Sequence, residues 1–280
     1  MFSLKTASVL ICTSVLMVCP LRSEAAVATH LDVDFRGYTL GSVKGQSEPG
    51  AGTWTGGASW FGSVVSATYG AGSQALEVYK TASGSGGRGS VAMGSGVSLS
   101  TANKIYWAFD FNLKGTTSNI EMRLTNGGSE GTVANLGFGV RINGTGNKLA
   151  FATSTEGGSL VMTEASSFAL STDTWYRLEL EITQGTTAGQ GTFSVYASSE
   201  ANPTRTLILG NQAYSFSAQN FTTYTATPGT TGASSTAMLV NNLIVQSGLE
   251  EFPIHQIPEG NTVAYVLFGA AGLLGYRLRR

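Results

Sequence analysis

The chain has 280 residues, a formal net charge of −1 and only 12% charged residues, against 42% hydrophobic and 10% aromatic ones. The apolar fraction is large enough to offset the entropy of chain ordering, which excludes a disordered protein. Because no basic stripe is present between the two ends, we exclude nucleic acid as a partner.

Residues 1–28 are predicted to be a signal peptide. Lys5 supplies a positive start, and an apolar run extends from residue 7 to residue 18. Small residues follow, so that cleavage after Ala25 or after Ala28 fits the pattern of an export signal. The alternative is a buried helix at the start of a cytosolic fold. Both cysteines, Cys12 and Cys19, lie within residues 1–28, which leaves the mature protein without thiol chemistry or a disulfide.

Residues 29–249 are predicted to form one all-β domain, a two-sheet antiparallel jelly-roll sandwich. Short runs with strand character recur between clusters of Gly, Asn, Ser and Thr, and helical periodicity is nearly absent. The expected strands are 31–35, 60–68, 74–79, 89–93, 104–113, 120–125, 136–142, 148–153, 175–182, 191–197, 206–209 and 237–246. About twelve antiparallel strands suggest two packed sheets.

Alternation of apolar residues is clearest in two of these runs. Every odd position from Ile105 to Leu113 is apolar, and the even positions from Tyr176 to Ile182 are predicted to face the core. In the second run Arg177, Glu179 and Glu181 point away from the core. The polar connection at 143–147 predicts a hairpin over 136–153.

Residues 250–258 are expected to form an extended linker, and residues 259–280 a membrane-sorting or anchor segment. An apolar stretch from Val263 to Tyr276 precedes a basic end. As a helix it would reach about 22 Å, which is short for a hydrocarbon core of roughly 30 Å. We predict a short transmembrane helix whose arginines hold the C-terminus in the cytoplasm. The alternative is a helix packed on the globular domain.

This C-terminal segment resembles the PEP-CTERM sorting signal, a Pro-Glu-Pro motif followed by an apolar helix and a basic end. The matching residues are Pro258, Glu259, Arg277, Arg279 and Arg280, and the departure is Gly260, where the family has its second proline. The resemblance implies a bacterial exported protein whose partners are the export machinery and an exosortase-type membrane protease. Gly260 leaves open whether the tail is cleaved.

The order of segments between the ends resembles the concanavalin A-like lectin and glucanase sandwiches. The segments are an early Asp34-Phe35-Arg36-Gly37-Tyr38, a middle 106–111 strand, a late 175–178 strand and a closing 240–245 strand that returns beside the first. The resemblance implies a jelly roll with one concave face that is often used for glycans. It implies no particular activity.

Candidate catalytic residues are few. With two histidines, His30 near the start of the domain and His255 in the linker, a Ser-His-Asp arrangement or an ordinary zinc site is not expected. Glu179 and Glu181 lie two apart on one strand and share a face, as the paired carboxylates of a retaining glycosidase would. Glucanases of this fold have a third acid on that strand, where this chain has Gln184. The alternative for the pair is a solvated outer face.

Two further sets of residues are candidate binding groups. Asp32 and Asp34 alternate on the first strand and could bind Ca²⁺ together with carbonyl oxygens. Aromatic residues in loop-like sequence could stack on a sugar ring: Trp54, Trp60, Tyr69 and Tyr224. The alternative is that Trp54 and Trp60 are ordinary residues at the edge of the core.

The leading hypothesis is a non-enzymatic protein of the cell envelope, surface or extracellular matrix that contacts carbohydrate or mediates adhesion. One alternative is a glycoside-active enzyme that uses Glu179 and Glu181. Another is a purely structural matrix protein, which the low charge favours.

Overall fold

The computed structural model describes residues 27–56, 62–67, 74–80, 89–99, 103–114, 119–127, 136–143, 146–156, 159–217, 220–228, 235–249 and 251–253. These residues contain strands and no helix, and so no helix of membrane-spanning length and hydropathy occurs among them. The strands are β1 (Ala28–Val33), β2 (Gly41–Ser42), β3 (Thr55–Gly56), β4 (Ser63–Ser66), β5 (Gln74–Lys80), β6 (Gly89–Ser98), β7 (Lys104–Leu113), β8 (Asn119–Thr125), β9 (Leu136–Asn143), β10 (Lys148–Glu156), β11 (Ser159–Glu164), β12 (Trp175–Gln184), β13 (Gln190–Ser199), β14 (Thr206–Ser215), β15 (Asn220–Pro228) and β16 (Ser235–Ser247).

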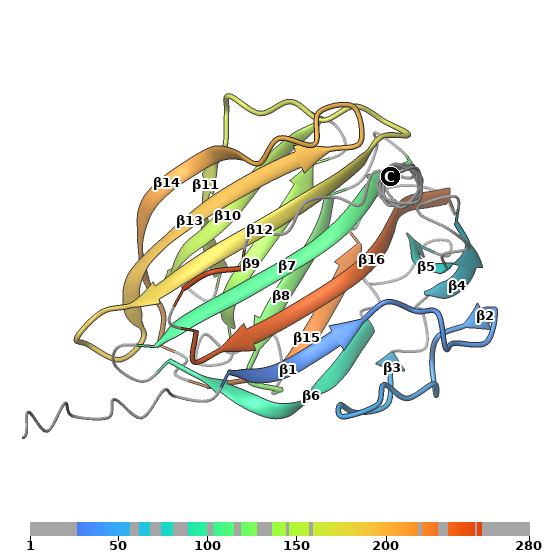
Figure 1. The fold of residues 1–280 in the computed structure, drawn as a ribbon, viewed down its shortest axis with the longest axis horizontal. Coiled ribbons are helices and arrows are strands. Elements are labelled where there is room, and N and C mark those ends of the chain that lie inside the picture. Colours follow the sequence, from blue (N-terminus) through green and yellow to red (C-terminus); the bar gives the residue numbers. More distant parts are fainter. Residues whose placement is uncertain are drawn as a thin grey trace, which may run out of the picture.

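The strands follow one hydrogen-bonded path that folds back on itself as two layers. The first runs β2-β4-β5-β16-β7-β12-β13-β14, with β1 added beside β16, and faces the viewer in Figure 1. The second runs β10-β9-β8-β15-β6-β3, with β11 added beside β10. One parallel contact, between Ser154 and Ser215, joins the layers at the β14–β10 corner. All other strand pairs among the described residues are antiparallel, as expected for a jelly-roll sandwich.

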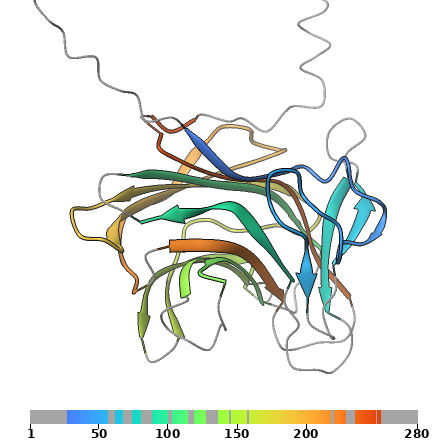
Figure 2. The same cartoon turned by 90° about the horizontal axis from the view of Figure 1, so that it is seen from below.

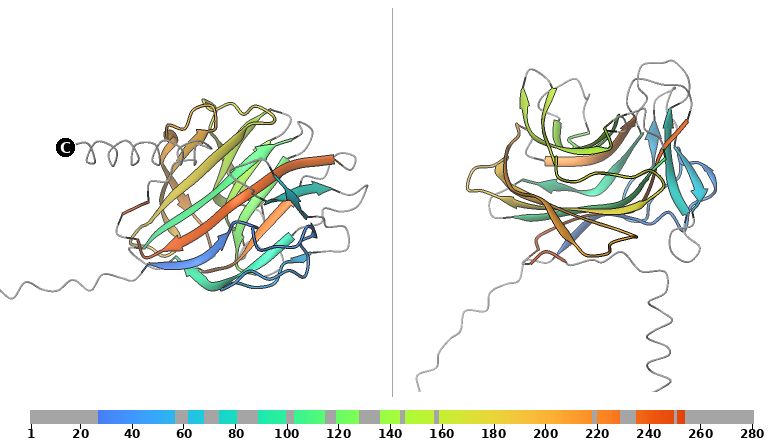
Figure 3. Two further views of the ribbon diagram at one scale, coloured as in Figure 1. Left: turned by 45° about the vertical axis from the view of Figure 1, so that its right-hand side comes forward. Right: turned by 90° about the horizontal axis from the view of Figure 1, so that it is seen from above.

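Both layers curve in the same sense, so that one nests in the other (Figures 2 and 3). We call the β16-β7-β12-β13 layer the convex layer and the β9-β8-β15-β6 layer the concave layer. In the right-hand view of Figure 3, β10 and β11 rise along one side, and β4 and β5 rise along the other. The outer face of the concave layer therefore lies on the inside of this curve.

Alternating side chains from the two layers fill the space between them. On β7 the odd-numbered residues from Ile105 to Leu113 are all buried in the core, as the sequence predicts. Trp107 of the convex layer meets Tyr224 of the concave layer edge to face, with ring centroids 6.5 Å apart. Aromatic contacts of this kind fix the two layers against each other.

The predicted all-β fold is confirmed, and many strands lie where expected. The 104–113 strand has the predicted bounds, β9 and β10 form the predicted hairpin, and β16 returns beside β1. The strands β2, β3, β11 and β15 were not predicted. The predicted signal peptide and C-terminal segment fall on residues 1–26 and 254–280, which lie outside the described residues.

Candidate functional site

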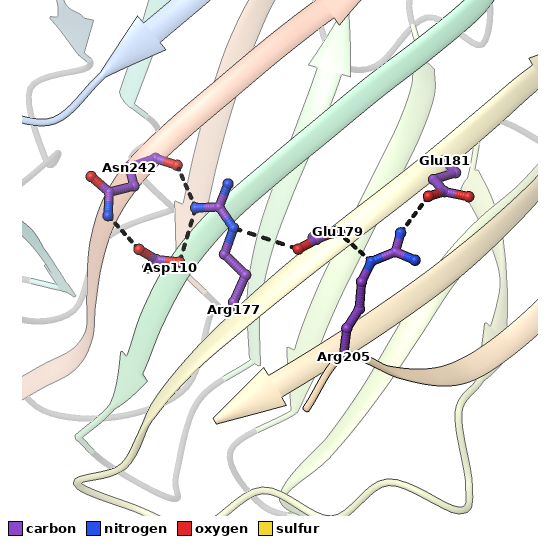
Figure 4. A network of polar contacts seen from close by, with 6 residues as sticks. All are labelled: Asp110, Arg177, Glu179, Glu181, Arg205 and Asn242. Carbon is purple, nitrogen blue, oxygen red and sulfur yellow. Dashed lines mark hydrogen bonds and ion pairs between the residues drawn. The ribbon is translucent and has the colours of Figure 1, made fainter. Parts of the chain in front are cut away.

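A chain of alternating charges crosses the outer face of the convex layer from β16 to the start of β14 (Figure 4). Arg177 on β12 donates from Nη1 to Asp110 Oδ1 on β7 at 3.0 Å. Arg205 donates from Nε to Glu179 Oε2 at 2.7 Å, and it also binds Glu181. The Arg205 guanidinium stacks on the Tyr196 ring, with its carbon 3.4 Å from the ring centroid. One arginine thus holds both carboxylates that the sequence offers as a catalytic pair.

A bulge in β16 completes this chain of charges at its other end. The register between β16 and β7 shifts between Asn241 and Ile244, so β16 has one extra residue there. Asn242 adopts a left-handed φ of 45° and donates from Nδ2 to Asp110 Oδ2. Asparagine tolerates this conformation better than most residues. The bulge therefore turns an amide toward the buried carboxylate of Asp110.

Burial corrects the expectation of a solvated outer face. Glu179 is 1% exposed, and Arg177 and Asp110 are also buried. Burial raises the pKa of Glu179, and the favourable hydrogen bond and charge of Arg205 only partly oppose it. Arg205 therefore holds a Glu179 carboxylate that lies beneath the surface of the convex layer.

A second polar cluster lies on the outer face of the concave layer. Glu121 on β8 stands directly opposite Arg141 on β9, which donates from Nε to Glu121 Oε1 at 2.7 Å. Arg123, two residues further along β8, binds the other carboxylate oxygen. One carboxylate thus bridges two guanidinium groups. The neighbouring residues on these strands, such as Met122 and Val140, are buried in the core, so the cluster faces outward.

Hydroxyl groups adjoin this cluster on the neighbouring strand β15. Register places Thr225 opposite Arg123 and Thr227 opposite Glu121, so all four share one face. The Oγ1 atoms of Thr225 and Thr227 are buried and have no hydrogen-bond partner among the described residues. A buried hydroxyl without a partner is uncommon and calls for an explanation.

On the other side of the cluster the face is apolar. Gly139 on β9 stands opposite Arg123, and a Cβ added there would lie 3.0 Å from Leu160 Cδ1 and 3.5 Å from Arg123 Cγ. The missing side chain lets Leu160 and Arg123 approach each other. Leu160 and Met162 on β11 are partly buried and pack against the core. The charged cluster and these apolar side chains therefore lie next to each other on the outer face of the concave layer.

The electrostatics of the concave cluster differ from those of the convex layer. Burial raises the pKa of Glu121, but the charges of Arg123 and Arg141 outweigh burial and lower that pKa below its usual value. Glu121 is therefore an anion at neutral pH. The Arg141 side chain is 35% exposed, against 17% for Arg123 and 15% for Glu121. Arg141 is the member of the cluster most accessible to a ligand.

Two predicted sugar-stacking residues lie inside the core, which corrects the expectation of an exposed platform. Trp54 is 1% exposed, and Tyr224 is fully buried. Their rings meet edge to face at 6.2 Å, and Trp54 Nε1 donates to Tyr38 Oη at 3.0 Å. Neither ring has an open face for a sugar. Trp60 and Tyr69 lie outside the described residues.

The predicted Ca²⁺ ligands do not gather into a site within the described residues. Asp34 accepts hydrogen bonds from the backbone and the Nε of Arg36, and its side chain is paired with that arginine. Asp32 is on β1, opposite Ile244. No group of three or more potential metal-binding side chains occurs in the described part of the chain.

His30 joins three strands, β1, β6 and β16. Its Nδ1 lies 2.7 Å from the carbonyl oxygen of Ser95 on β6, and its Nε2 lies 2.7 Å from Ser247 Oγ on β16. A neutral ring with its proton on Nδ1 donates to the carbonyl and accepts from the hydroxyl. His30 therefore ties β1 to both layers.

Sequence reasoning passed over Glu121, Arg123 and Arg141. The signal was present, because Glu121 and Arg123 alternate with apolar residues in an expected strand, and Arg141 is the one charged residue among Gly and apolar neighbours. Three charged groups on adjacent outward positions can bind a polar ligand.

No protein-family profile and no curated protein matches the chain. Solved structures similar to it include the lectin UEA-II complexed with galactose, at 9% identity and a TM-score of 0.48, covering 79% of this chain and 100% of the lectin. A carbohydrate esterase from the Shiga toxin-encoding bacteriophage phi24B has 16% identity and a TM-score of 0.47, over 79% of this chain and 99% of its own. The carbohydrate binding module CBM66 from Bacillus subtilis has 11% identity and a TM-score of 0.41, over 69% of this chain and 94% of its own. At these identities the likeness concerns the β-sandwich fold alone.

Proposed function

We propose that this protein is a non-enzymatic, exported carbohydrate-binding protein whose ligand lies on the outer face of the concave layer. The observation that carries this proposal is the cluster of Glu121, Arg123 and Arg141 beside the partly buried Leu160 and Met162. Planar charged groups form paired hydrogen bonds with neighbouring hydroxyls, and an apolar surface accommodates the face of a sugar ring.

The terminal sequences support the export part of the proposal. A signal peptide at residues 1–28 would send the chain across the membrane. The segment at 259–280 would anchor it at least transiently, with an exosortase-type protease as a partner. The folded domain would then act at the cell surface or in the extracellular matrix.

The arrangement on the convex layer favours a binding protein over a glycoside-active enzyme. Arg205 contacts both Glu179 and Glu181, and Glu179 is buried. A nucleophile or general acid must reach the bond that it cleaves. Before it could react, Glu179 would have to break its contact with Arg205 and become accessible to a substrate.

A glycan array probed with the full chain, followed by calorimetry on the best ligand, tests the proposal. We expect Arg141→Gln to weaken binding and the double variant Glu179→Gln/Glu181→Gln to keep it. Release of sugar by the wild type, lost in the double variant, would instead indicate an enzyme. Binding to no glycan would favour a purely structural matrix protein.

A further inference from the structure

The two ends of the domain meet at one edge of the convex layer. The strands β1 and β16 are antiparallel neighbours, and Ala28 pairs with Ser247. His30 reinforces this contact, because its Nε2 lies 2.7 Å from Ser247 Oγ. The chain therefore enters and leaves the sandwich at neighbouring positions, the start of β1 and the end of β16 (Figure 1).

After β16 the chain stays on the outer face of the convex layer. The backbone N–H of Gly248 donates to Asn103 Oδ1 at 2.9 Å, just before β7 begins. The Lys104 ammonium then lies over the Phe252 ring, 5.5 Å from its centroid. Ile105 is buried in the core, so Lys104 beside it on the strand points to the outer face. Phe252 therefore marks the side of the sandwich from which the C-terminal part of the chain departs.

The candidate ligand face lies on the opposite side of the sandwich from Phe252. Glu121 and Arg141 are on the outer face of the concave layer, and the core separates this layer from the convex one (Figure 3). Stacked sheets lie about 10 Å apart, and side chains extend beyond each outer face. Ten residues, 253–262, join Phe252 to the apolar stretch that begins at Val263. They reach at most about 35 Å, so turning the concave face to a membrane would use much of this length to pass both layers.

We infer that the anchored protein turns the outer face of the convex layer toward the membrane lipids and holds the concave face away from them. The inference rests on the membrane anchor of the proposed function and adds its orientation. Two exposed residues mark the surface that faces the lipids: Thr183 stands opposite Lys104, and Leu207 stands opposite Tyr196. The concave face then stays open to polysaccharide outside the cell.

Single labelled cysteines locate the membrane, because both native cysteines lie in the predicted signal peptide. Thr183→Cys and Leu207→Cys place a fluorescent label on the convex face. Asn119→Cys is the matched variant on the concave face, since Asn119 is exposed and precedes Glu121 by two residues on β8. Each variant is isolated from host membranes with its C-terminal segment and returned to phosphatidylcholine vesicles that carry a nitroxide quencher on the lipid headgroup. A water-soluble nitroxide is the control, because it measures how exposed each label is on the folded domain.

We expect the lipid nitroxide to quench the labels at positions 183 and 207 and to leave the label at position 119 at its unquenched intensity, while the soluble nitroxide quenches all three. Equal quenching of the three labels by the lipid nitroxide, or stronger quenching at position 119, would overturn the orientation and leave the anchor intact. A protein that does not float with the vesicles would overturn the anchor together with the orientation. The glycan array tests carbohydrate binding separately from both.

Discussion

Arg141 stands directly opposite Glu121 across the β8–β9 pair and donates to it at 2.7 Å, while Arg123 binds the same carboxylate from the β8 side. This pairing makes Glu121 the group that holds both arginines in place. Its removal should therefore affect both the fold and the proposed ligand-binding face.

We expect Glu121→Gln to lower the free energy of unfolding at pH 7 by about 1–3 kcal/mol, because two partly buried guanidinium groups lose the carboxylate that they share. The matched control is Glu164→Gln, since Glu164 is about half exposed and paired with Lys148. An exposed pair contributes less than about 1 kcal/mol. Urea denaturation of both variants measures the difference, and equal losses would contradict the account.

The pH dependence of this effect has a definite sign. The pKa of Glu121 is lowered in the folded state, so its contribution to stability is present above the unfolded pKa of about 4.3. That contribution is lost as pH falls through the folded pKa. The difference between wild type and Glu121→Gln should therefore shrink in acid, as denaturation curves between pH 7 and pH 2 would reveal.

Arg205 is expected to stabilise the convex layer strongly. Arg205→Gln leaves Glu181 without this cation and leaves Glu179 only the longer contact with Arg177 Nε at 3.9 Å. Loss of one partner of a buried ion pair costs about 3 kcal/mol or more. Thermal unfolding at pH 7 measures the loss, with Arg36→Gln as a control on an exposed arginine. A change no larger than that of the control would mean that the carboxylates have other partners.

Ionisation of Glu179 should change the stability of the fold with pH in the opposite direction to ionisation of Glu121. Its pKa is raised in the folded state, so stability falls as pH rises from about 4.3 through the folded pKa. Glu179→Gln removes this titration. The difference in the free energy of unfolding between the variant and the wild type should therefore be at least as favourable to the variant at pH 7 as at pH 4. A variant that loses more stability at pH 7 than at pH 4 would contradict the raised pKa of Glu179.

Tyr224 should behave as a core residue. Its ring is fully buried, and its hydroxyl has no hydrogen-bond partner among the described residues. Tyr224→Phe removes that buried hydroxyl, so we expect stability to be unchanged or to rise by about 1 kcal/mol. Glycan affinity should also be unchanged. A loss of affinity in a variant of wild-type stability would restore the prediction of a sugar-stacking role.

The start of β1 favours one of the two cleavage sites of the proposed signal peptide. Ala28 pairs with Ser247, and Thr29 pairs with Gln246, so β1 needs both residues. Cleavage after Ala25 keeps the strand whole, whereas cleavage after Ala28 removes its first residue. We predict that the mature protein begins at Ala26, which intact-mass analysis of the exported protein can check; a start at Thr29 would contradict it.

Strong alternation made much of the fold predictable. In 104–113 the odd-numbered residues from Ile105 to Leu113 are apolar, and both ends of the strand were placed correctly. The β15 strand was missed because a bulge between Phe221 and Thr223 breaks its alternation. The β11 strand was missed because Leu160, Val161 and Met162 are apolar in succession, which hides the period of two.

The candidate site was harder to predict, because it depends on which strands are neighbours. The alternation of the 120–125 run is consistent with the outward direction of Glu121 and Arg123, which the sequence analysis did not use, and no such pattern places Arg141 opposite Glu121. The sequence pattern also gave no sign that Glu179 is buried. Glu179 occupies an outward position and is nevertheless buried under its contact with Arg205. A strand pattern gives the direction of a side chain, not what packs over it.

Hydrogen–deuterium exchange of the full chain, with and without its best glycan ligand, tests the central claim most directly. We predict that the ligand slows exchange in β8, β9 and β15, the strands that carry Glu121, Arg141 and Thr225. The convex strands β7 and β12 should be unaffected. Protection confined to β7 and β12, with none in the concave layer, would contradict the account.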